Sequence, residues 1–562
     1  MSYFEKNLAF LKERDRADEH LIQTLGNVEV YAVQKNRRGE FWLEIQGEMV
    51  HGKVAPRKEA IKVLRNMESE VQIHVGFGLG YYLSAQQERF PESASKLYIL
   101  EPDQRILKTM LEVVDLEQLF GSRPFQLFCA EKAFLQALEL GLEKADSLPF
   151  FVMPYHRRRF GTSIERITQK LRRLVEQRRY NAYSDRKLGP VFAQSTLRSL
   201  SHWMNAVRFD QIMMRLKDRP AVVISPGPSL EKNLHQLVAF RERVVVIAVS
   251  RVVRILERYG IEPDFLVHIE AQDFFELIDG ASNLVSTYFI LQEQVEAKYF
   301  QYPSRGVISY HNANNKMAKL IYEAIPEAKR MSLPTGGSVA HDALSAAVFL
   351  GCNPIALIGQ DLALHGSRMY SSGTEGTTQK FPTQPIKGFF GFPVETLNNY
   401  NQFRIWFEEA AEAYRDHFPE LKLYNATEGG AHIEGFQPIS FAEFLFHTGP
   451  KGFCVRSLLK SVLNKNQSPN IRHGQIKDLL NNWLKEFKNF SFEKWVETSA
   501  QREEARTSAD QTLTKLGAFM GGNIEKEWFR LTGESQRLAL FEEVEAQKVQ
   551  IIVKLQHIQN LF

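Results

Sequence analysis

Short, nearly continuous apolar runs recur through the middle of the chain and constrain its fold more than any other feature. Such runs are typical of parallel strands that helices cover on both faces. Because the connections between such strands are right-handed, the sequence predicts a doubly wound, Rossmann-like α/β domain over residues 201–450, with ligands beyond the carboxyl ends of the strands. The runs are Ala221–Ile224, Val244–Val249, Phe265–Ile269, Tyr288–Leu291, Val307–Ser309 and Ile355–Ile358.

A glycine-rich turn between a strand and a helix is also predicted upstream, in the segment VQIHVGFGLGYYL. Gly76, Gly78 and Gly80 follow an apolar run, and the next predicted strand ends in Glu101. This order resembles the start of an S-adenosylmethionine-dependent methyltransferase, in which the turn is tight and the acid accepts hydrogen bonds from a ribose. The alternative is that the glycines only allow a helix to pack closely on the sheet. No catalytic residues of a methyltransferase follow.

The remaining segments complete the domain organisation that we expect. Residues 1–65 predict a small leading α+β subdomain, and residues 66–154 predict a Rossmann-like domain. Residues 155–200 are basic and helical and predict a connector with a solvated face. Residues 451–562 lack strand signals and predict a helical bundle that could bind a protein partner. Its apolar helix faces comprise Ile476, Leu479, Trp483 and Phe487, and Leu540, Val544, Ile551, Leu555 and Ile558.

Composition excludes several classes of protein. Lys and Arg total 70 against 66 Asp and Glu, and the net charge of +4 is too small to indicate a nucleic-acid partner. Cys129, Cys352 and Cys454 match neither a zinc-ligand spacing nor a disulfide framework, and fit a reducing compartment. The start of the chain lacks an apolar signal region, and no run of about 18 apolar residues occurs. We therefore expect a cytoplasmic protein without membrane insertion.

The segment AVVISPGPSL is the first candidate for ligand binding. A buried strand is expected to end at Ser225 and to turn through Gly227 and Pro228 to Ser229, which is a good helix N-cap. Gly227 lets the backbone approach a ligand closely, and the helix start offers unpaired amides to a phosphate. The alternative is a purely structural link between strand and helix.

A second glycine-rich turn lies in the block LPTGGSVAHDALSAAVFLGCNPIALIGQDLAL. It comprises Thr335, Gly336, Gly337 and Ser338 and precedes a predicted buried helix. The strand that follows this helix delivers Gly359 and Asp361 to the carboxyl edge of the sheet. Two turns suited to phosphate and one carboxylate thus converge where a doubly wound fold binds its ligands. This convergence predicts a binding site rather than two unrelated turns.

Four segments in order carry a family resemblance: ISPGPSL, GIEPDFLVHIEAQD, PTGGSVAHDALSAAVFLGCNPIALIGQDLA and NATEGGAHIEGF. Together they resemble the Maf family of motility-associated flagellin glycosyltransferases, over roughly residues 200–450. That family is in turn similar to bacterial sialyltransferases. The resemblance implies an enzyme that moves a nonulosonic acid, such as a pseudaminic, legionaminic or sialic acid, from its CMP derivative to Ser or Thr of flagellin. Flagellin and a nucleotide sugar would then be its partners, in support of motility.

The resemblance also implies where the donor binds. CMP would contact Gly227, Pro228 and Ser229 in the first turn and all four residues of the second, Thr335–Ser338, while Gly359 and Asp361 would border the cytidine or the sugar. The first turn of the sialyltransferases commonly reads GNGPSL, whose Asn helps to hold the nucleotide. This chain has Pro226 at that position, so the hydrogen bonding of the donor must differ there.

Transfer of the sugar needs a base for the acceptor hydroxyl and a group that stabilises the departing phosphate. His432 corresponds in order to the histidine of the sialyltransferases and is the predicted base, because histidine titrates near neutral pH. Asp361 is the second catalytic candidate, and His365 is held in reserve. A structural role at the surface is the alternative for His432. Tyr370 is the candidate for stabilising the phosphate.

Acidic residues near the third predicted strand form another candidate group. Asp264, Glu270 and Asp273, which we expect to follow that strand, could bind a divalent cation or the acceptor. The alternative is that they are solvated or cap helices. Apart from this divalent cation, the sequence assigns no cofactor, and the CMP-sugar would be the donor substrate.

Two other functions stay open. The central segment is distantly similar to an archaeal pterin pyrophosphokinase, which would need ATP and magnesium, but no GxxxxGKS/T loop occurs in the chain. A non-enzymatic flagellin-binding chaperone would instead act through the C-terminal helices, and its central pocket would only carry ligand.

Overall fold

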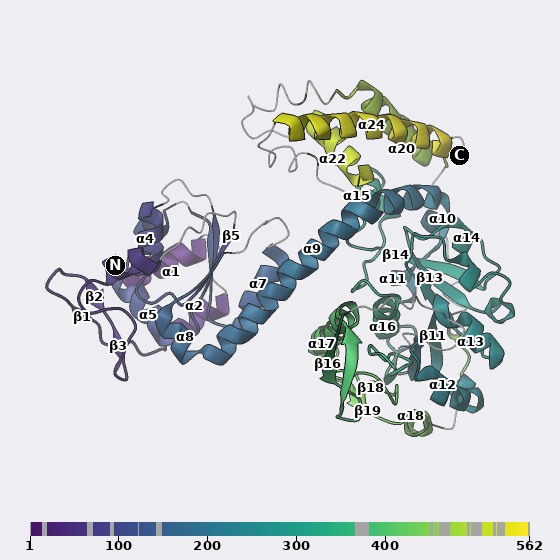
Figure 1. Cartoon of the computed structure of the whole chain (residues 1–562), viewed down its shortest axis with the longest axis horizontal. Helices are drawn as coiled ribbons and strands as arrows, with labels where there is room; N and C mark the ends of the chain where they lie inside the picture. Colours follow the sequence, from purple (N-terminus) through teal and green to yellow (C-terminus); the bar gives the residue numbers. More distant parts are fainter. Residues whose placement is uncertain are drawn as a thin grey trace. The chain divides into compact units, whose positions relative to one another are not determined.

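The computed structural model divides into two compact units, Met1–Ala182 and Tyr183–Phe562 (Figure 1). Among the helices that it describes, none has the length and apolar character needed to cross a membrane. The described residues are 2–13, 19–63, 71–89, 95–121, 123–141, 149–365, 382–449, 453–455, 457–459, 473–491, 495, 508–520, 524 and 534–559.

A four-stranded parallel sheet forms the centre of the first unit. In the strand Lys96–Leu100, alternate side chains belong to different hydrophobic cores. Leu97 and Ile99 pack on one face of the sheet, and Tyr98 and Leu100 pack on the other. This pattern confirms a Rossmann-like sheet covered on both faces, as predicted for residues 66–154. In spatial order, the strands are β7 (Phe125–Phe128), β6 (Lys96–Leu100), β5 (Val71–Val75) and β8 (Phe150–Val152).

The described residues of the leading segment, 2–13 and 19–63, share a core with this sheet. Leu11, Leu43 and Val50 pack in the same buried cluster as Leu97 and Ile106. Two short antiparallel pairs lie in this segment, β1 (Gln34–Lys35) with β2 (Phe41–Trp42) and β3 (Glu44–Ile45) with β4 (Glu48–Met49). The helices of the unit are α1 (Tyr3–Glu13), α2 (Glu19–Leu25), α3 (Pro56–Val63), α4 (Tyr81–Arg89), α5 (Gln104–Val113), α6 (Leu116–Phe120) and α7 (Glu131–Gly141).

The predicted connector, residues 155–200, is helical, as expected. It comprises α8 (Pro154–Arg159) and the 38-residue helix α9 (Gly161–Arg198). The side chains of Arg157, Arg158 and Arg159 are exposed, which agrees with a solvated basic face.

A nine-stranded sheet, parallel throughout, forms the centre of the second unit, and all six predicted strands are present in it. The sheet is longer than predicted, because β9, β18 and β19 extend its two edges. In spatial order, the strands are β19 (Gln437–Pro438), β18 (Leu423–Asn425), β15 (Ile355–Ile358), β10 (Ala221–Ile224), β11 (Val245–Val249), β12 (Phe265–His268), β13 (Tyr288–Gln292), β14 (Gly306–Tyr310) and β9 (Val207–Arg208).

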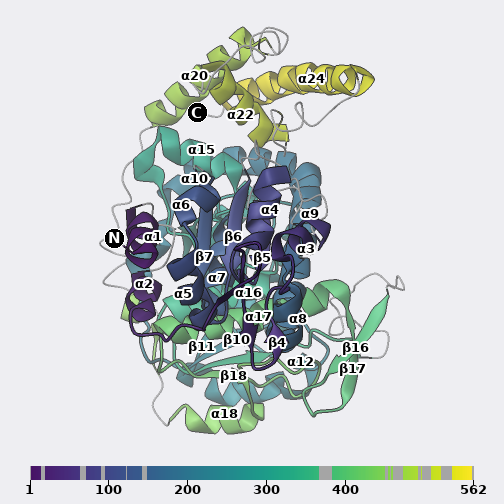
Figure 2. The ribbon, with the colours of Figure 1, turned by 90° about the vertical axis from the view of Figure 1, so that its left-hand side faces the viewer.

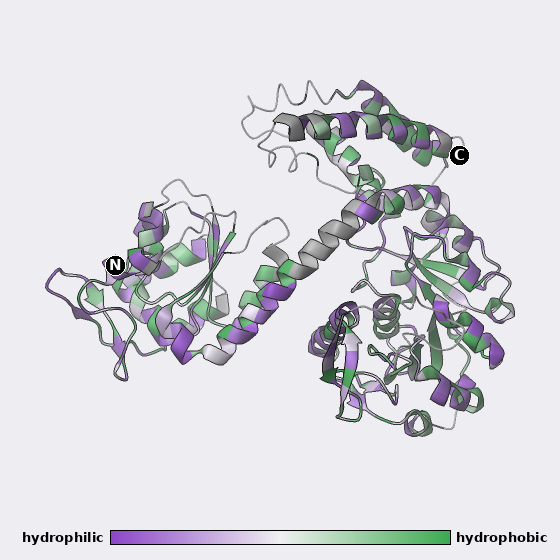
Figure 3. Ribbon diagram, in the orientation of Figure 1, coloured by the Kyte–Doolittle hydropathy of each residue, from purple (hydrophilic) through white to green (hydrophobic). Residues whose placement is uncertain are grey.

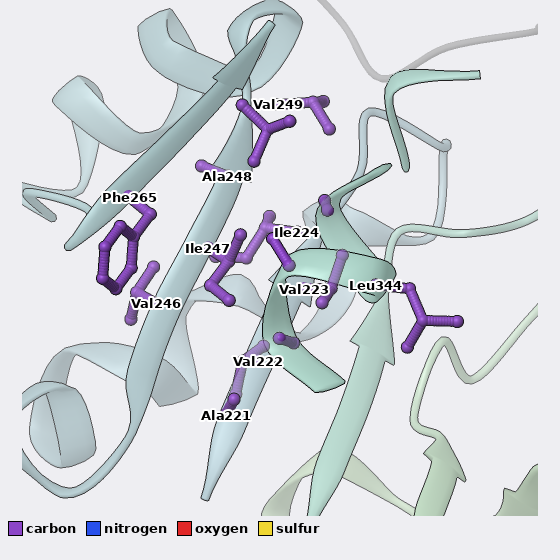
Figure 4. Close-up of a cluster of buried hydrophobic side chains, with 14 of the residues drawn as sticks. Ala221, Val222, Val223, Ile224, Val246, Ile247, Ala248, Val249, Phe265 and Leu344 are labelled. Atoms are coloured by element: carbon purple, nitrogen blue, oxygen red, sulfur yellow. The ribbon is translucent and has the colours of Figure 1, made fainter. Parts of the chain in front are cut away.

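The apolar runs form strands because both faces of this sheet are buried. Every residue of β10, β11 and β12 is buried, and the middle of the sheet is mainly green in the hydropathy colouring of Figure 3. Figure 4 shows Val223 and Ile247 of two neighbouring strands in the buried cluster to which Leu344 of a covering helix also belongs. Burial of such side chains stabilises the fold by roughly 1.5 to 3 kcal/mol each.

Helices join these strands, and one antiparallel hairpin that was not predicted lies outside the sheet. The hairpin consists of β16 (Thr383–Lys387) and β17 (Pro393–Leu397). The helices are α10 (Leu200–Asn205), α11 (Phe209–Ile212), α12 (Leu230–Asn233), α13 (Val253–Arg258), α14 (Ala297–Phe300), α15 (Lys316–Ala324), α16 (Val339–Phe349), α17 (Asn398–His417) and α18 (Phe441–His447).

The described part of the C-terminal region, which belongs to the second unit, is helical, as predicted, and packs on α10 and α15. It includes α20 (His473–Asn489), α22 (Ser508–Met520) and α24 (Glu534–Gln559), which lie beside α15 in both ribbon views (Figure 1, Figure 2). Trp203 of α10 and Ile321 of α15 belong to the same buried cluster as these helices. All the side chains predicted for the two apolar faces are buried there: Ile476, Leu479, Trp483, Phe487, Leu540, Val544, Ile551, Leu555 and Ile558.

Candidate functional site

The strand order reverses between β10 and β15, which are neighbours at the centre of the large sheet. Ile224 of β10 pairs with Ile358 of β15 in parallel. The chain leaves β10 towards β11 on one side, and it reaches β15 on the other side only after β14. Ligands of doubly wound folds bind beyond the carboxyl ends of the strands at such a reversal. The first predicted turn follows β10, and the predicted residues Gly359 and Asp361 follow β15, so both segments lie at this reversal.

The first turn is packed directly against the turn after β15. The Gly227 amide donates a hydrogen bond of 2.7 Å to the carbonyl of Gly359. A Cβ atom on Gly227 would lie 2.0 Å from a carboxylate oxygen of Asp361, and one on Gly359, whose φ is +62°, would lie 2.0 Å from the carbonyl oxygen of Ser225. The glycines thus allow two segments of the chain to approach each other. The space beside the Cα atom of Gly227 is filled by Asp361, and the predicted close approach of a ligand to this backbone stays a prediction.

Asp361 accepts hydrogen bonds from the first turn. The hydroxyl of Ser229 donates to it at 2.7 Å, and the amide of Ser229 donates at 3.2 Å. Burial raises the pKa of Asp361 to about 6, although these hydrogen bonds and the nearby Lys232 oppose the shift. Gly227, Pro228 and Ser229 are all buried. The amide of Ser229, which was expected to bind phosphate, is therefore already paired with a carboxylate.

A third segment, Gly429–His432, covers Asp361. The amide of Ala431 donates to the Asp361 carbonyl at 2.7 Å, and a Cβ atom on Gly430 would lie 2.2 Å from that carbonyl oxygen. His432 thus directly follows a residue that is bonded to Asp361, and the catalytic roles predicted for His432 and Asp361 stay predictions. The imidazole Nε2 of His432 lies 3.3 Å from the exposed carboxylate of Glu434. This position is half-buried and borders the hairpin, since the His432 amide donates to Lys387.

The second turn, Thr335–Ser338, is half-buried apart from the exposed Gly337, and it leads into the 11-residue helix α16. Gly336 has no room for a side chain, because a Cβ atom there would lie 2.4 Å from His341. Gly337 has a φ of +80°, and a Cβ atom at this position would meet no described atom within 4 Å. Among the described residues, no group accepts a hydrogen bond from the amides of Val339 and Ala340. Unpaired amides and the helix dipole favour an anion at this point.

A buried polar network that was not predicted holds this second turn in place. Asp342 of α16 accepts hydrogen bonds from Thr335 (2.8 Å), Gln292 (2.8 Å) and Tyr310 (2.6 Å). Burial raises the pKa of Asp342 to about 6, and the three hydrogen bonds oppose the shift. Because Gln292 and Tyr310 end β13 and β14, the network ties the turn to the carboxyl edge of the sheet.

The network continues into the segments that follow β13 and β14. The side chain of Asn312 donates to both Gln292 and Gln294, each at 3.2 Å. Glu293, which is fully buried, is 2.7 Å from Nδ1 of His311. Polar residues directly after apolar runs, as in YFILQEQ and VISYHN, are the sequence signal that could have identified this cluster.

The acidic residues near β12 do not form one site. Asp264 precedes the strand and lies at its amino end, where it accepts from the amide of Val246 and pairs with Arg241 at 3.0 Å. The prediction that it follows the strand is therefore wrong. Glu270 does follow it, and burial raises its pKa. Asp273 is exposed and pairs with Lys298, which lowers its pKa.

Metal binding gains no support from these positions. In the described part of the chain, no three His, Cys, Asp or Glu side chains are grouped as a metal site would require. His365 is exposed at the end of a described stretch. Tyr370 lies outside the described residues, so its predicted contact with phosphate stays a prediction.

The glycine turn of the first unit is filled by its own side chains. Glu101 is fully buried and accepts hydrogen bonds from the amides of Phe77 (2.7 Å) and Gly78 (3.2 Å), and it lies 2.7 Å from Nε2 of His156. A Cβ atom on Gly78 would lie 2.3 Å from His51. The carboxylate that a ribose would need is thus bonded to the turn itself. This packing favours the structural interpretation over the methyltransferase one.

Comparisons with known proteins agree with this architecture. Residues 194–367 match the model of a family described as 6-hydroxymethylpterin diphosphokinase MptE-like. The chain is also similar to a solved structure of the Maf glycosyltransferase from Magnetospirillum magneticum AMB-1, with a TM-score of 0.58 and 15% identity over 99% of this chain and 96% of that one. No curated protein matches the sequence. The likeness to the solved structure shows that the two proteins share a fold.

Proposed function

We propose that the protein is a glycosyltransferase that moves a nonulosonic acid from a CMP-sugar to Ser or Thr of flagellin. The observation that carries this proposal is the open turn at the start of α16, where the amides of Val339 and Ala340 lack acceptors among the described residues. Such a helix start suits the phosphate of CMP. The fold shared with a Maf glycosyltransferase over 99% of the chain supports the same function.

In the proposed reaction, the acceptor hydroxyl attacks the anomeric carbon, and CMP leaves with the electron pair of the broken bond. The phosphate of the departing CMP would be held at Thr335–Ser338, where the helix dipole stabilises negative charge. Asp361 and His432 remain the catalytic candidates, on two segments that pack against each other. The wide spacing of Cys129, Cys352 and Cys454 in the sequence supports the cytoplasmic location that we propose.

A pair of substitutions at Gly337 tests the donor site. Gly337→Asp should weaken CMP binding at least about tenfold, because a carboxylate at the start of α16 competes with the phosphate. Gly337→Asn is the matched control, since it has the same shape without charge and both residues tolerate a positive φ. Isothermal titration with CMP measures both. Equal affinities of the two variants would show that the phosphate binds elsewhere.

The transfer itself is tested with unmodified flagellin and a panel of CMP-activated nonulosonic acids. A mass increment on flagellin with one donor is the expected result. Tight flagellin binding without any increment, with donors that the host itself uses, would instead support a chaperone function through the C-terminal helices.

The match of residues 194–367 to a pterin diphosphokinase family favours a second candidate function. That reaction transfers diphosphate from ATP to a hydroxymethylpterin and releases AMP. AMP formation from ATP, magnesium and 6-hydroxymethyl-dihydropterin, in the absence of any sugar transfer, would favour this candidate over the glycosyltransferase.

A further inference from the structure

Glu293 and His311 form a buried pair at the carboxyl edge of the large sheet. The strands β13 and β14 pair in parallel with Gln292 opposite Tyr310, so the next residue of each strand lies beside the other. Glu293 is fully buried, and the side chain of His311 retains 10% of its exposure. The carboxylate oxygen Oε1 lies 2.7 Å from Nδ1 of His311.

Further contacts fix this pair. The other carboxylate oxygen of Glu293 accepts the amide of Asn312 at 3.1 Å, and Tyr322 donates its hydroxyl to Oε1. The ring of Tyr322 packs edge-on against the imidazole, with centroids 5.0 Å apart. Burial, and then the charge of Glu293, raise the pKa of Tyr322, so its hydroxyl stays a donor. The carboxylate is thus held by two groups, the Asn312 amide and the Tyr322 hydroxyl, and can hold the imidazole in one orientation.

This arrangement leaves one ring nitrogen available. A carboxylate on Nδ1 selects the tautomer that carries its proton there, which leaves the lone pair on Nε2. Within the described part of the chain, Nε2 has no hydrogen-bond partner, and 10% of the side chain stays accessible. A carboxylate that orients a histidine in this way is the arrangement by which enzymes prepare a general base.

The pair belongs to the same network as the open turn. Thr335 donates to Asp342, Asp342 accepts from Gln292, and Gln292 accepts from the side chain of Asn312. The backbone amide of Asn312 in turn donates to Glu293. Continuous hydrogen bonds therefore connect the proposed phosphate turn to the His311 pair at one edge of the sheet.

We infer that His311, oriented by Glu293, is the general base of the proposed glycosyl transfer, and this inference rests on the proposed function. As the acceptor oxygen bonds to the anomeric carbon and CMP departs, Nε2 takes the hydroxyl proton and later releases it to solvent. The geometry favours His311 over His432, whose only side-chain partner among the described residues is the exposed Glu434 at 3.3 Å.

His311→Gln tests the inference in the full-length enzyme with flagellin and its active donor. Glutamine can still donate a hydrogen bond to Glu293 but cannot take a proton, so kcat should fall by about 10² to 10⁴ while CMP affinity stays unchanged. His417→Gln, on an exposed histidine of α17, is the control and should retain wild-type activity. Full activity of His311→Gln, with the loss appearing in His432→Gln instead, would overturn the inference.

Glu293→Gln tests the positioning role of the carboxylate and carries the test if His311→Gln does not fold. We expect a lower kcat with an unchanged KM for the donor, because the tautomer is no longer selected while the donor turn is intact. An unchanged kcat would contradict the role. The two proposals can be told apart by their outcomes. A wild-type enzyme that is inactive with every donor would contradict the proposed function. An active wild type with unaffected activity in His311→Gln would contradict only the assignment of the base.

Discussion

Replacing Glu101 with alanine should lower the free energy of unfolding of the first unit by about 3 to 5 kcal/mol, because it leaves buried partners of the carboxylate unpaired. Those partners are the amides of Phe77 and Gly78 and the imidazole of His156, which is itself fully buried. Hydrogen exchange of the full chain measures the effect. Peptides from residues 71–101 should exchange faster than in the wild type, and peptides from the second unit should exchange at an unchanged rate.

Glu101→Gln is the matched variant for this experiment. The carboxamide keeps the shape of the side chain and one oxygen that can accept a hydrogen bond from the Phe77 amide. The glutamine variant should therefore lose clearly less free energy of unfolding than the alanine variant. Addition of S-adenosylmethionine provides an independent check. Protection of the turn Gly76–Gly80 by that ligand in the wild-type chain would show that Glu101 can exchange its internal partners for a ribose, against the structural interpretation.

The central strands could be predicted because each is buried on both faces and is therefore a continuous apolar run in the sequence. Ala221–Ile224 and Ile355–Ile358 have the predicted bounds, and the other four differ by one or two residues. The strands at the edges could not be predicted. Val207–Arg208 and Gln437–Pro438 are two residues long and are not buried, so neither hydrophobicity nor period marks them.

Local sequence could not decide which glycine turn is open. The segments ISPGPSL and PTGGS both place glycine before a helix start, and by local chemistry both suit a phosphate. The difference arises from Asp361, which lies 132 residues beyond Ser229 in the chain and pairs with its amide and hydroxyl. Only the three-dimensional arrangement shows that the Ser229 amide of the first turn already has a hydrogen-bond acceptor. It also shows that the amides of Val339 and Ala340, after the second turn, have none among the described residues.

The polar network at the second turn depends on strand register. Each of Gln292, Glu293 and His311 follows an apolar run, a signal that the sequence does contain. Whether Glu293 meets His311 or another polar residue depends on the pairing of Gln292 with Tyr310, however. A shift of one residue would turn these side chains to opposite faces. Pairs of this kind can therefore be proposed from sequence only as a set of alternatives.

We expect Asp361→Asn to change the free energy of unfolding of the second unit more favourably at neutral pH than in acid. The difference between the two changes should be about 3 kcal/mol. Burial raises the pKa of Asp361 from 3.8 to about 6. Between these values the folded chain retains a proton that the unfolded chain releases, so the carboxyl reduces stability as the pH rises through this window. Two pKa units correspond to about 3 kcal/mol, and asparagine removes this cost.

Urea unfolding gives the free energy of unfolding of wild type and variant at pH 4 and at pH 7.5. Comparing the effect of the substitution at the two pH values cancels any loss of the hydrogen bonds to Ser229 that does not depend on pH. Asp273→Asn is the control with the opposite sign, because the exposed Asp273 has a lowered pKa and its small contribution is lost as the pH falls. A difference for Asp361→Asn that does not change between the two pH values would contradict the raised pKa. Lost transfer activity in the stabilised variant would then show that this buried carboxyl is retained for function at the expense of stability.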